Sequence, residues 1–143
     1  MAASDLPDEL LDRCRRDHQA WLRGDGSGYA LPEDGTILGA VGSWAPGGAV
    51  TAELQQAVAS GFSAGEGEVE VLNGGVDGNL AWVTLIERGR VVLDRRDGPR
   101  RWDLRVTEVF RRTLKGWQRV HRHADPLVDL HDPATMADLL VDG

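Results

Sequence analysis

The sequence contains a single cysteine and has no apolar run as long as a membrane span. Cys14 cannot form a disulfide within the chain, which is typical of a reducing compartment. A spanning helix needs about 18 or more consecutive apolar residues. The N-terminal residues M-A-A-S-D-L-P-D-E also lack the basic and apolar regions of a secretion signal. The composition therefore predicts a cytoplasmic protein with no membrane partner.

A recognition motif for nucleic acid is also missing, although one stretch of the chain is basic. Ten Lys and Arg residues lie between Arg95 and Arg122, whereas residues 126–143 contain four Asp and no basic residue. The formal net charge is −7. Several of the arginines fall in an expected loop or at a hairpin end, where charged side chains stay solvated. We therefore expect no nucleic-acid partner.

What is present is enough for one folded domain. A chain of 143 residues with 41% hydrophobic and 27% charged residues suits a single core, and we find no internal repeat or linker. We assign residues 1–126 to this domain and residues 127–143 to an acidic tail. The tail contains one short helix, capped at Asp132 with Pro133 in its first turn.

Helix signals are concentrated in the first half of the chain. A helix begins near Asp5 or Pro7 and ends at Gly24, with an apolar face that includes Cys14 and His18. A short strand at 36–40 and a loop at 41–48 follow. A second amphipathic helix is expected at 50–60, before Gly61.

Strand signals fill the second half. Alternating apolar residues predict strands at 68–76 and 80–93, joined by an Asp-Gly turn, with a loop at 94–101. The strand at 80–93 is apolar in both parities, so we expect it to be central and buried on both faces. Two further strands form a hairpin from 102 to 126 with its turn at 113–116. Helices first and long antiparallel strands later predict an α+β fold with the helices on one face of a curved sheet.

The hairpin also resembles a known family. Its sequence L-R-V-T-E-V-F-R-R, then a turn, then W-Q-R-V-H-R-H-A-D is similar to the end of SnoaL-like proteins of the nuclear transport factor 2-like superfamily, which includes ketosteroid isomerase. The resemblance is clearest over residues 77–126. It implies a cone-shaped, strongly bent antiparallel sheet wrapped around the N-terminal helices (nuclear transport factor 2-like or cystatin-like). The open end of such a cone is a ligand pocket, and the outer sheet face commonly forms a homodimer.

The resemblance places Glu108 where ketosteroid isomerase has an oxyanion-hole aspartate, which that enzyme keeps protonated in an apolar site. Strand parity directs Glu108 inward. A buried carboxylate needs a raised pKa or a partner, and Arg122 on the next strand could be that partner. His18, on the apolar face of the first helix, is a candidate acid or base near neutral pH, although a structural histidine is the simpler interpretation. We take Glu108, His18 and Arg122 as the candidate catalytic residues.

Ketosteroid isomerase activity itself is not predicted. The position of that enzyme's general base falls on Gly39, and its oxyanion-hole tyrosine falls near Asp17 or His18. Because the reaction requires a base within hydrogen-bonding reach of the proton it removes, the missing carboxylate argues against it.

Two further groups complete the candidate site. Inward parity selects apolar and aromatic ligand contacts, while Trp117, Arg119, His121 and His123 fall on the outward parity of the last strand. A β-bulge would turn the two histidines inward, so they stay on the list. Their motif H-x-H-x-D could ligate a metal, but no second His or Cys cluster exists and we expect no metal and no cofactor. The candidate ligand-binding residues are Asp17, Trp21, Tyr29, Trp44, Trp82, Trp102, Leu104, Val106, Phe110, Val120, His121 and His123.

Two functions fit these features. The resemblance implies a cofactor-independent isomerase, cyclase or dehydratase acting on a hydrophobic, polyketide- or steroid-like molecule. The alternative is a non-catalytic ligand-binding or dimerisation module, as in the calcium/calmodulin-dependent kinase association domain, which ends in a similar W-x-x-V-H-x-H motif. In both cases we expect a homodimer formed through the outer sheet face.

Overall fold

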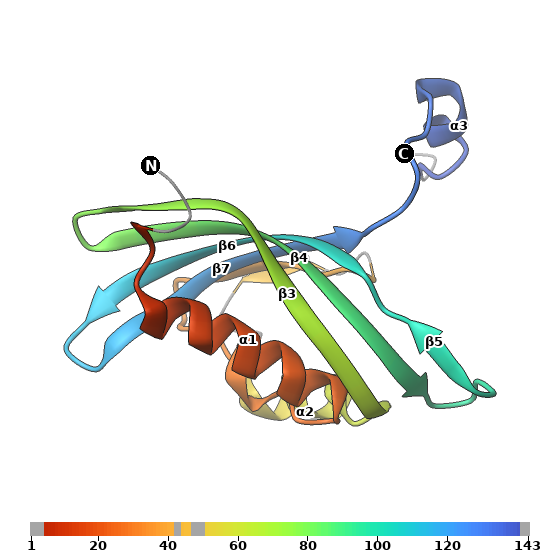
Figure 1. Cartoon of the computed structure of the whole chain (residues 1–143), viewed down its shortest axis with the longest axis horizontal. Coiled ribbons are helices and arrows are strands. Elements are labelled where there is room, and N and C mark those ends of the chain that lie inside the picture. The colour runs from red at the N-terminus through yellow and green to blue at the C-terminus, as the bar shows by residue number, and fades with distance from the viewer. Residues whose placement is uncertain (1–4, 42–43, 47–50, 141–143) are drawn as a thin grey trace.

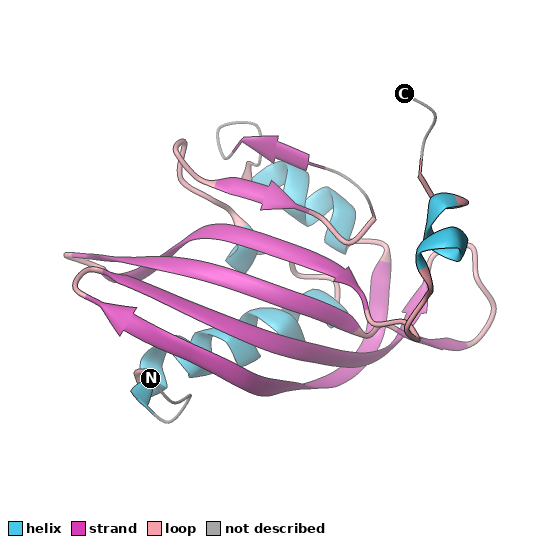
Figure 2. Cartoon of the chain, turned by 90° about the horizontal axis from the view of Figure 1, so that it is seen from above, coloured by secondary structure: helices cyan, strands magenta, loops and turns pink. Residues whose placement is uncertain are grey.

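The computed structural model describes residues 5–41, 44–46 and 51–140, and for residues 44–46 it describes the backbone alone. Among these residues the strands form one seven-stranded sheet, with α1 and α2 packed against its concave side (Figures 1 and 2). The long strands bend as they pass the helices, so the sheet wraps around them. The predicted α+β architecture is confirmed.

The first helix, α1 (Asp8–Leu22), follows Pro7 and buries one face that includes Leu10, Cys14, His18 and Leu22. It ends where predicted. Gly24 has a φ of 94°, a left-handed conformation that glycine adopts without strain, and its N–H donates to the Trp21 carbonyl at 2.9 Å.

Two short helical elements extend this layer. A single 3₁₀ turn, η2 (Ser27–Tyr29), follows α1. The second helix, α2 (Ala52–Ala59), is capped by the Thr51 side chain, which accepts a hydrogen bond from the Leu54 N–H at 3.1 Å. The predicted helix began at Val50, which lies outside the described residues.

The sheet has the order β2-β1-β7-β6-β4-β3, with β5 paired to β4. Its strands are β1 (Thr36–Leu38), β2 (Trp44–Pro46), β3 (Phe62–Asp77), β4 (Leu80–Leu93), β5 (Pro99–Arg101), β6 (Leu104–Thr113) and β7 (Gly116–Pro126). The predicted central strand β4 pairs with β3, β5 and β6. In contrast to the expected antiparallel sheet, β1 runs parallel to β7, so the sheet is mixed.

Several predicted boundaries were wrong. The predicted loops at 41–48 and 94–101 contain the short strands β2 and β5. Strand β3 begins at Phe62 rather than at 68, because an irregularity between Ser63 and Glu66 interrupts the alternation of side chains there. Only the inner face of β4 is buried in the single chain; on its outer face Trp82 is 42% exposed.

A bulge in β7 corrects the predicted inward and outward parity. The pairing with β6 shifts between Val109, opposite His121, and Phe110, opposite Arg119, so Val120 is the extra residue. A bulge places two side chains of the strand on the same face. Trp117 and Arg119 are therefore buried, at 7% and 1% exposure, instead of outward, while Arg122 and Ala124 still point inward.

The apolar core has two parts. The larger lies between the N-terminal half of α1 and the sheet, around Leu10, Leu85 and Phe110. The smaller consists of Leu22, Phe62 and Val91, with Trp21 and Trp102 packed against it. The second part forms the inner wall of the cavity described below.

The tail contains α3 (Pro133–Ala137), which stands away from the sheet and the other helices (Figure 1). Asp132 caps it as predicted, accepting from the Thr135 N–H at 2.7 Å. No described helix has the length and apolar character needed to cross a bilayer.

Candidate functional site

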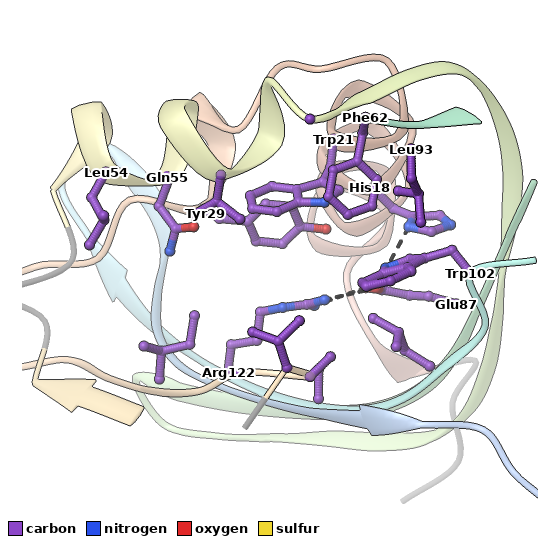
Figure 3. A pocket seen from close by; sticks show the side chains of 18 of the residues that line it. His18, Trp21, Tyr29, Leu54, Gln55, Phe62, Glu87, Leu93, Trp102 and Arg122 are labelled. Carbon is purple, nitrogen blue, oxygen red and sulfur yellow. Dashed lines mark hydrogen bonds and ion pairs between the residues drawn. The ribbon is translucent and has the colours of Figure 1, made fainter. Parts of the chain in front are cut away.

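A cavity of about 540 Å³ lies between the two main helices and the concave face of the sheet (Figure 3). Its volume is in the range of small-molecule binding sites. The lining is mainly apolar and comes from α1, η2, β1, α2, β3, β4, β6 and β7 and from the loops between them. Its residues are His18, Trp21, Tyr29, Ile37, Gly39, Ala40, Val41, Leu54, Gln55, Val58, Gly61, Phe62, Glu87, Leu93, Asp94, Trp102, Leu104, Arg122 and Ala124.

Four aromatic rings form one continuous wall of this cavity. Trp21 contacts Tyr29 and Phe62 edge to face, with ring centroids 5.5 and 5.6 Å apart. Phe62 contacts Trp102 in the same way, at 5.0 Å. Edge-to-face packing holds each ring in a defined orientation, so this wall is a rigid surface for an apolar ligand.

The polar end of the cavity consists of His18, Glu87 and Arg122, which Figure 3 shows joined by dashed lines. Arg122 donates two hydrogen bonds to the two oxygens of Glu87, at 2.8 and 2.9 Å. His18 Nδ1 lies 3.6 Å from Glu87 Oε1. A buried carboxylate is thus stabilised by a guanidinium on one side and faces an imidazole on the other.

The second nitrogen of His18 determines where its mobile proton lies. Nε2 is 2.9 Å from the backbone carbonyl of Arg88. A carbonyl oxygen accepts but does not donate, so Nε2 must carry a hydrogen. The proton that His18 can gain or lose is therefore on Nδ1, next to Glu87.

Behind this end the polar groups continue as a buried charge cluster, which we define as Asp17, His18, Glu87, Glu108, Arg119 and Arg122. Arg119 donates to Glu108 at 2.6 and 3.3 Å and to Asp17 at 3.0 Å. Arg122 also donates to Glu108, at 3.1 Å. No buried side-chain nitrogen or oxygen among the described residues lacks a hydrogen-bond partner, so each buried polar atom of the cluster has at least one.

Glu108 is completely buried but does not line the cavity. Burial raises its pKa, but the Arg119 and Arg122 guanidiniums lower it by more, so the net pKa lies below the ordinary glutamate value. Glu108 is thus ionised at neutral pH. This differs from the protonated carboxylic acid that the resemblance to ketosteroid isomerase suggests.

Tyr29 packs against both arginines of the cluster. The Arg119 and Arg122 guanidinium carbons each lie 4.6 Å from the centre of its ring, a distance that gives cation–π attraction. Burial, reinforced by the charge of Glu87, raises the pKa of Tyr29 well above its ordinary value. Its hydroxyl is therefore neutral. Burial also raises the pKa of the Cys14 thiol, so Cys14 is not a nucleophile.

A glycine allows α1 to approach β3 closely enough to bring His18 into the site. A Cβ atom added to Gly67 would lie 2.2 Å from the Arg88 carbonyl oxygen, 2.6 Å from Leu22 Cδ1 and 2.9 Å from His18 Nε2. These distances are far below van der Waals contact. The hydrogen bond between His18 and Arg88 therefore depends on the missing side chain at position 67.

The structure brings some of the predicted site residues to the cavity and separates others from it. His18, Arg122, Trp21, Tyr29, Trp102 and Leu104 line it; Asp17, Glu108, Val106 and Phe110 are buried behind it; Val120 is the half-buried residue of the bulge. Trp82, predicted at the cone mouth, points to the outer face instead. The side chain of Trp44 lies outside the description.

His121 and His123 stay on the outward side of β7, because the bulge precedes both of them. His121 pairs with Thr36 (Nδ1 to Oγ1, 2.7 Å), and His123 Nε2 lies 3.3 Å from Asp125. Among the described residues no group of three or more His, Cys, Asp or Glu is arranged to hold a metal ion.

Sequence reasoning missed Glu87, Asp94, Gln55 and Arg119. Glu87 had a signal, because it has the same parity as Ala81, Val83 and Leu85, which are buried on the inner face of β4. Arg119 had none, since its inward direction depends on the bulge. Asp94 lies in a loop and Gln55 lies on α2. The hydrophobic periodicity of the sequence does not predict how close either one comes to the sheet.

Comparison with solved structures shows the fold. A proposed dehydratase of the NTF2-like family from Streptomyces avermitilis superposes with a TM-score of 0.69 and 19% identity, over 88% of this chain and 98% of that one. A ketosteroid isomerase-like protein from Erwinia carotovora atroseptica has a TM-score of 0.66 and 16% identity, over 87% and 100% of the two chains.

A proposed calcium/calmodulin-dependent protein kinase type II association domain from Thiobacillus denitrificans has a TM-score of 0.64 and 17% identity, over 85% of this chain and 95% of that one. No protein-family model and no curated protein matches the chain. The chain thus has the NTF2-like, or cystatin-like, fold. Neighbours with one fold and different assigned activities do not define a reaction.

Proposed function

We propose that this chain binds a hydrophobic small molecule and acts on it as a cofactor-independent isomerase, cyclase or dehydratase. The observation that supports the proposal most strongly is an apolar cavity with one polar end, made of His18, Glu87 and Arg122. Sites with this composition commonly hold an apolar ligand and orient it through a few polar groups. The assigned names of two neighbours, a proposed dehydratase and a ketosteroid isomerase-like protein, agree with this class.

The polar end has the groups that such chemistry needs. Moving a proton next to a carbonyl requires a base near the carbon and a donor near the oxygen. In the proposal His18 Nδ1 takes the proton, the Arg88 carbonyl orients the imidazole by accepting from Nε2–H, and Glu87 stabilises the imidazolium that forms. Arg122 has five N–H groups, and three of them donate to Glu87 and Glu108. The other two can donate to a ligand oxygen.

Glu108 has a different role in this proposal from the one suggested by sequence. It is an ionised counter-ion that holds Arg119 and Arg122 in place, without reaching the ligand. The general base of ketosteroid isomerase, which has no counterpart at Gly39, is replaced by His18 on α1.

The test is proton exchange at carbon, measured by NMR in D₂O with a panel of apolar cyclic ketones. We expect the wild-type protein to speed loss of the α-proton signal. His18→Gln should lower this rate by about 100-fold or more, the usual contribution of a general acid or base. His131→Gln is the matched control, since His131 is exposed in the tail and lines neither the cavity nor the smaller hollow of the outer sheet face, and it should leave the rate unchanged. Exchange that is equally fast in the folded His18→Gln variant contradicts the assignment.

A second candidate is a non-catalytic ligand-binding or dimerisation module, which one observation favours. Both oxygens of Glu87 already accept hydrogen bonds from Arg122, so this carboxylate is engaged in holding the cluster together. Saturable binding of the same ketones with no exchange above the protein-free rate would support this candidate over the enzyme.

We also propose that the outer sheet face forms a homodimer. The support is a group of exposed apolar side chains on β3 and β4, Leu72 (54%), Leu80 (52%) and Trp82 (42%), beside a hollow of about 320 Å³. Trp82→Glu should convert a dimer into a monomer by light scattering. Leu114→Glu, a control at the exposed hairpin turn, should not. A monomeric wild-type chain at high concentration contradicts the proposal.

A further inference from the structure

We propose that the polar end of the cavity selects ligands with a neutral oxygen and rejects carboxylates, and that Glu87 determines this selection. The inference rests on the proposed function, because it concerns the same cavity. Arg122 is the member of the charge cluster that a ligand can best reach, and the proposal depends on the negative charges of the carboxylates around it.

The exposure of each cluster member shows which group meets the ligand. The Arg122 side chain is 11% exposed, against 7% for Asp17, 4% for His18, 1% for Glu87 and 0% for Glu108 and Arg119. Arg122 also lines the cavity, whereas Arg119 does not. A ligand oxygen at this end therefore meets Arg122 before any other charged group of the cluster.

An arginine that lines a cavity usually attracts anions, but the charge of Arg122 is already balanced by carboxylates. Its guanidinium donates to two carboxylates, Glu87 and Glu108, and Glu108 is shared with Arg119. The cluster has three carboxylates, those of Asp17, Glu87 and Glu108, and two guanidiniums, and Arg13 reaches Asp17 from outside the cluster at 3.5 Å. The negative charges of Glu87 and Glu108 thus balance the positive charges of Arg119 and Arg122, so Arg122 has no unbalanced positive charge to offer a ligand.

A ligand carboxylate would be a fourth anion beside these three, and Asp94, an exposed residue of the cavity lining, is also negatively charged. Burying a charge without a partner is strongly unfavourable. A ketone or hydroxyl oxygen does not meet this penalty. It can accept a hydrogen bond from one of the two remaining N–H groups of Arg122 while the ligand rings lie against the Trp21–Phe62–Trp102 wall.

The role of Glu87 follows from its position. It holds two of the N–H groups of Arg122, in the bidentate arrangement that a ligand carboxylate would itself adopt. Replacing Glu87 with Gln removes one negative charge while nearly preserving the side-chain shape. Arg122 then has Glu108 as its only carboxylate partner, and the cluster carries one positive charge more beside the cavity, so the preference for the ketone should be lost.

The experiment uses three probes of matched shape: 2-acetylnaphthalene (a ketone), 2-naphthoate (a carboxylate) and 2-ethylnaphthalene (a hydrocarbon). Binding to the full-length protein is measured by calorimetry near neutral pH. We expect the wild-type protein to bind the ketone at least about tenfold more tightly than the carboxylate. The hydrocarbon should bind more weakly than the ketone, because it forms no hydrogen bond to Arg122.

For the Glu87→Gln variant we expect naphthoate affinity to rise by about tenfold or more while ketone affinity changes by less than about threefold. Glu70→Gln, which removes a carboxylate paired with Arg88 at 2.7 Å on the outer face, is the control and should change neither affinity. The wild-type comparison needs no variant, so it tests the proposal even if Glu87→Gln fails to fold.

The outcomes separate this inference from the proposed function. Wild-type protein that binds naphthoate as tightly as the ketone overturns the inference, while tight binding of any probe still supports the cavity. Equal affinity for all three probes also overturns it, since the polar end would then play no part. No binding of any probe overturns both.

Discussion

Strand β6 contributes to two bidentate ion pairs in two different surroundings. Inside the cone, Glu108 accepts two hydrogen bonds from Arg119, at 2.6 and 3.3 Å. At the hairpin end, Arg111 donates two to Asp34, at 2.7 and 3.1 Å. The first pair is fully buried, whereas the side chains of the second are 38% and 64% exposed.

In both pairs the carboxylate pKa lies below its ordinary value. For Asp34 the first cause is the hydrogen bond from Arg111. For Glu108 burial acts in the opposite direction and is overcome by two guanidiniums. The two pKa values are therefore lowered in the same direction but for different structural reasons. At Asp34 the lowering reflects a solvated surface contact, and at Glu108 it requires the whole cluster to stay in place.

The largest expected effect is that of Glu108→Gln on stability. Losing this carboxylate leaves Arg119 and Arg122 with one anionic partner fewer each, at a position that is 0% exposed. Removing one partner of a buried ion pair commonly costs on the order of 3 kcal/mol. The measurement is the free energy of unfolding in urea at neutral pH.

Asp34→Asn is the matched control, because it neutralises a carboxylate with the same bidentate pairing. It should move the urea midpoint by only a small fraction of the Glu108→Gln shift. Equal shifts for the two variants would show that the cluster is no more important for stability than a surface pair.

A smaller effect is expected on the acid dependence of stability. The pKa of Glu108 is lower in the native than in the unfolded chain, so the unfolded chain binds the proton more readily. The stabilisation by Glu108 is therefore present above the unfolded pKa, about 4.3. It is lost as the pH falls from there through the lower native pKa.

Unfolding free energy measured from neutral pH down to about pH 2 tests this. Wild type should lose more stability below about pH 4.5 than Glu108→Gln does, because the variant has no such carboxylate. Asp34→Asn should retain most of the wild-type acid loss. Parallel curves for wild type and Glu108→Gln would mean that other carboxylates dominate the acid loss.

The two regions also show what the sequence could predict. Alternation along β6 correctly put Leu104, Val106, Glu108 and Phe110 on the inner face, because a regular strand next to a core preserves its parity. Alternation along β4 could likewise have indicated that Glu87 points to the inner face. The fold was predictable for the same reason, since amphipathic helices followed by long alternating strands leave few arrangements.

The partner of Glu108 was only half predictable. Arg122 was expected, but Arg119 was placed outward, because nothing around Val120 signals a bulge: the residue is neither glycine nor proline. A single extra residue reverses the facing of every side chain before it. The positive charges of the cluster come from Arg119 and Arg122, which both point inward from β7. Strict alternation cannot predict this, because it places residues three positions apart on opposite faces.

The smallest effect is expected from a double-mutant cycle on the surface pair, with Asp34→Asn, Arg111→Gln and both together. Arg111 also donates to Gln118 at 3.4 Å, so the cycle is needed to isolate its coupling to Asp34. We expect a coupling close to the detection limit of urea unfolding, reduced further by raising the salt to about 0.5 M, since exposed charges are screened there. Both side chains of this pair are solvated, so the coupling should be weak and sensitive to salt. A coupling that does not change with salt and is as large as the stability lost in Glu108→Gln would show that burial does not distinguish the two pairs.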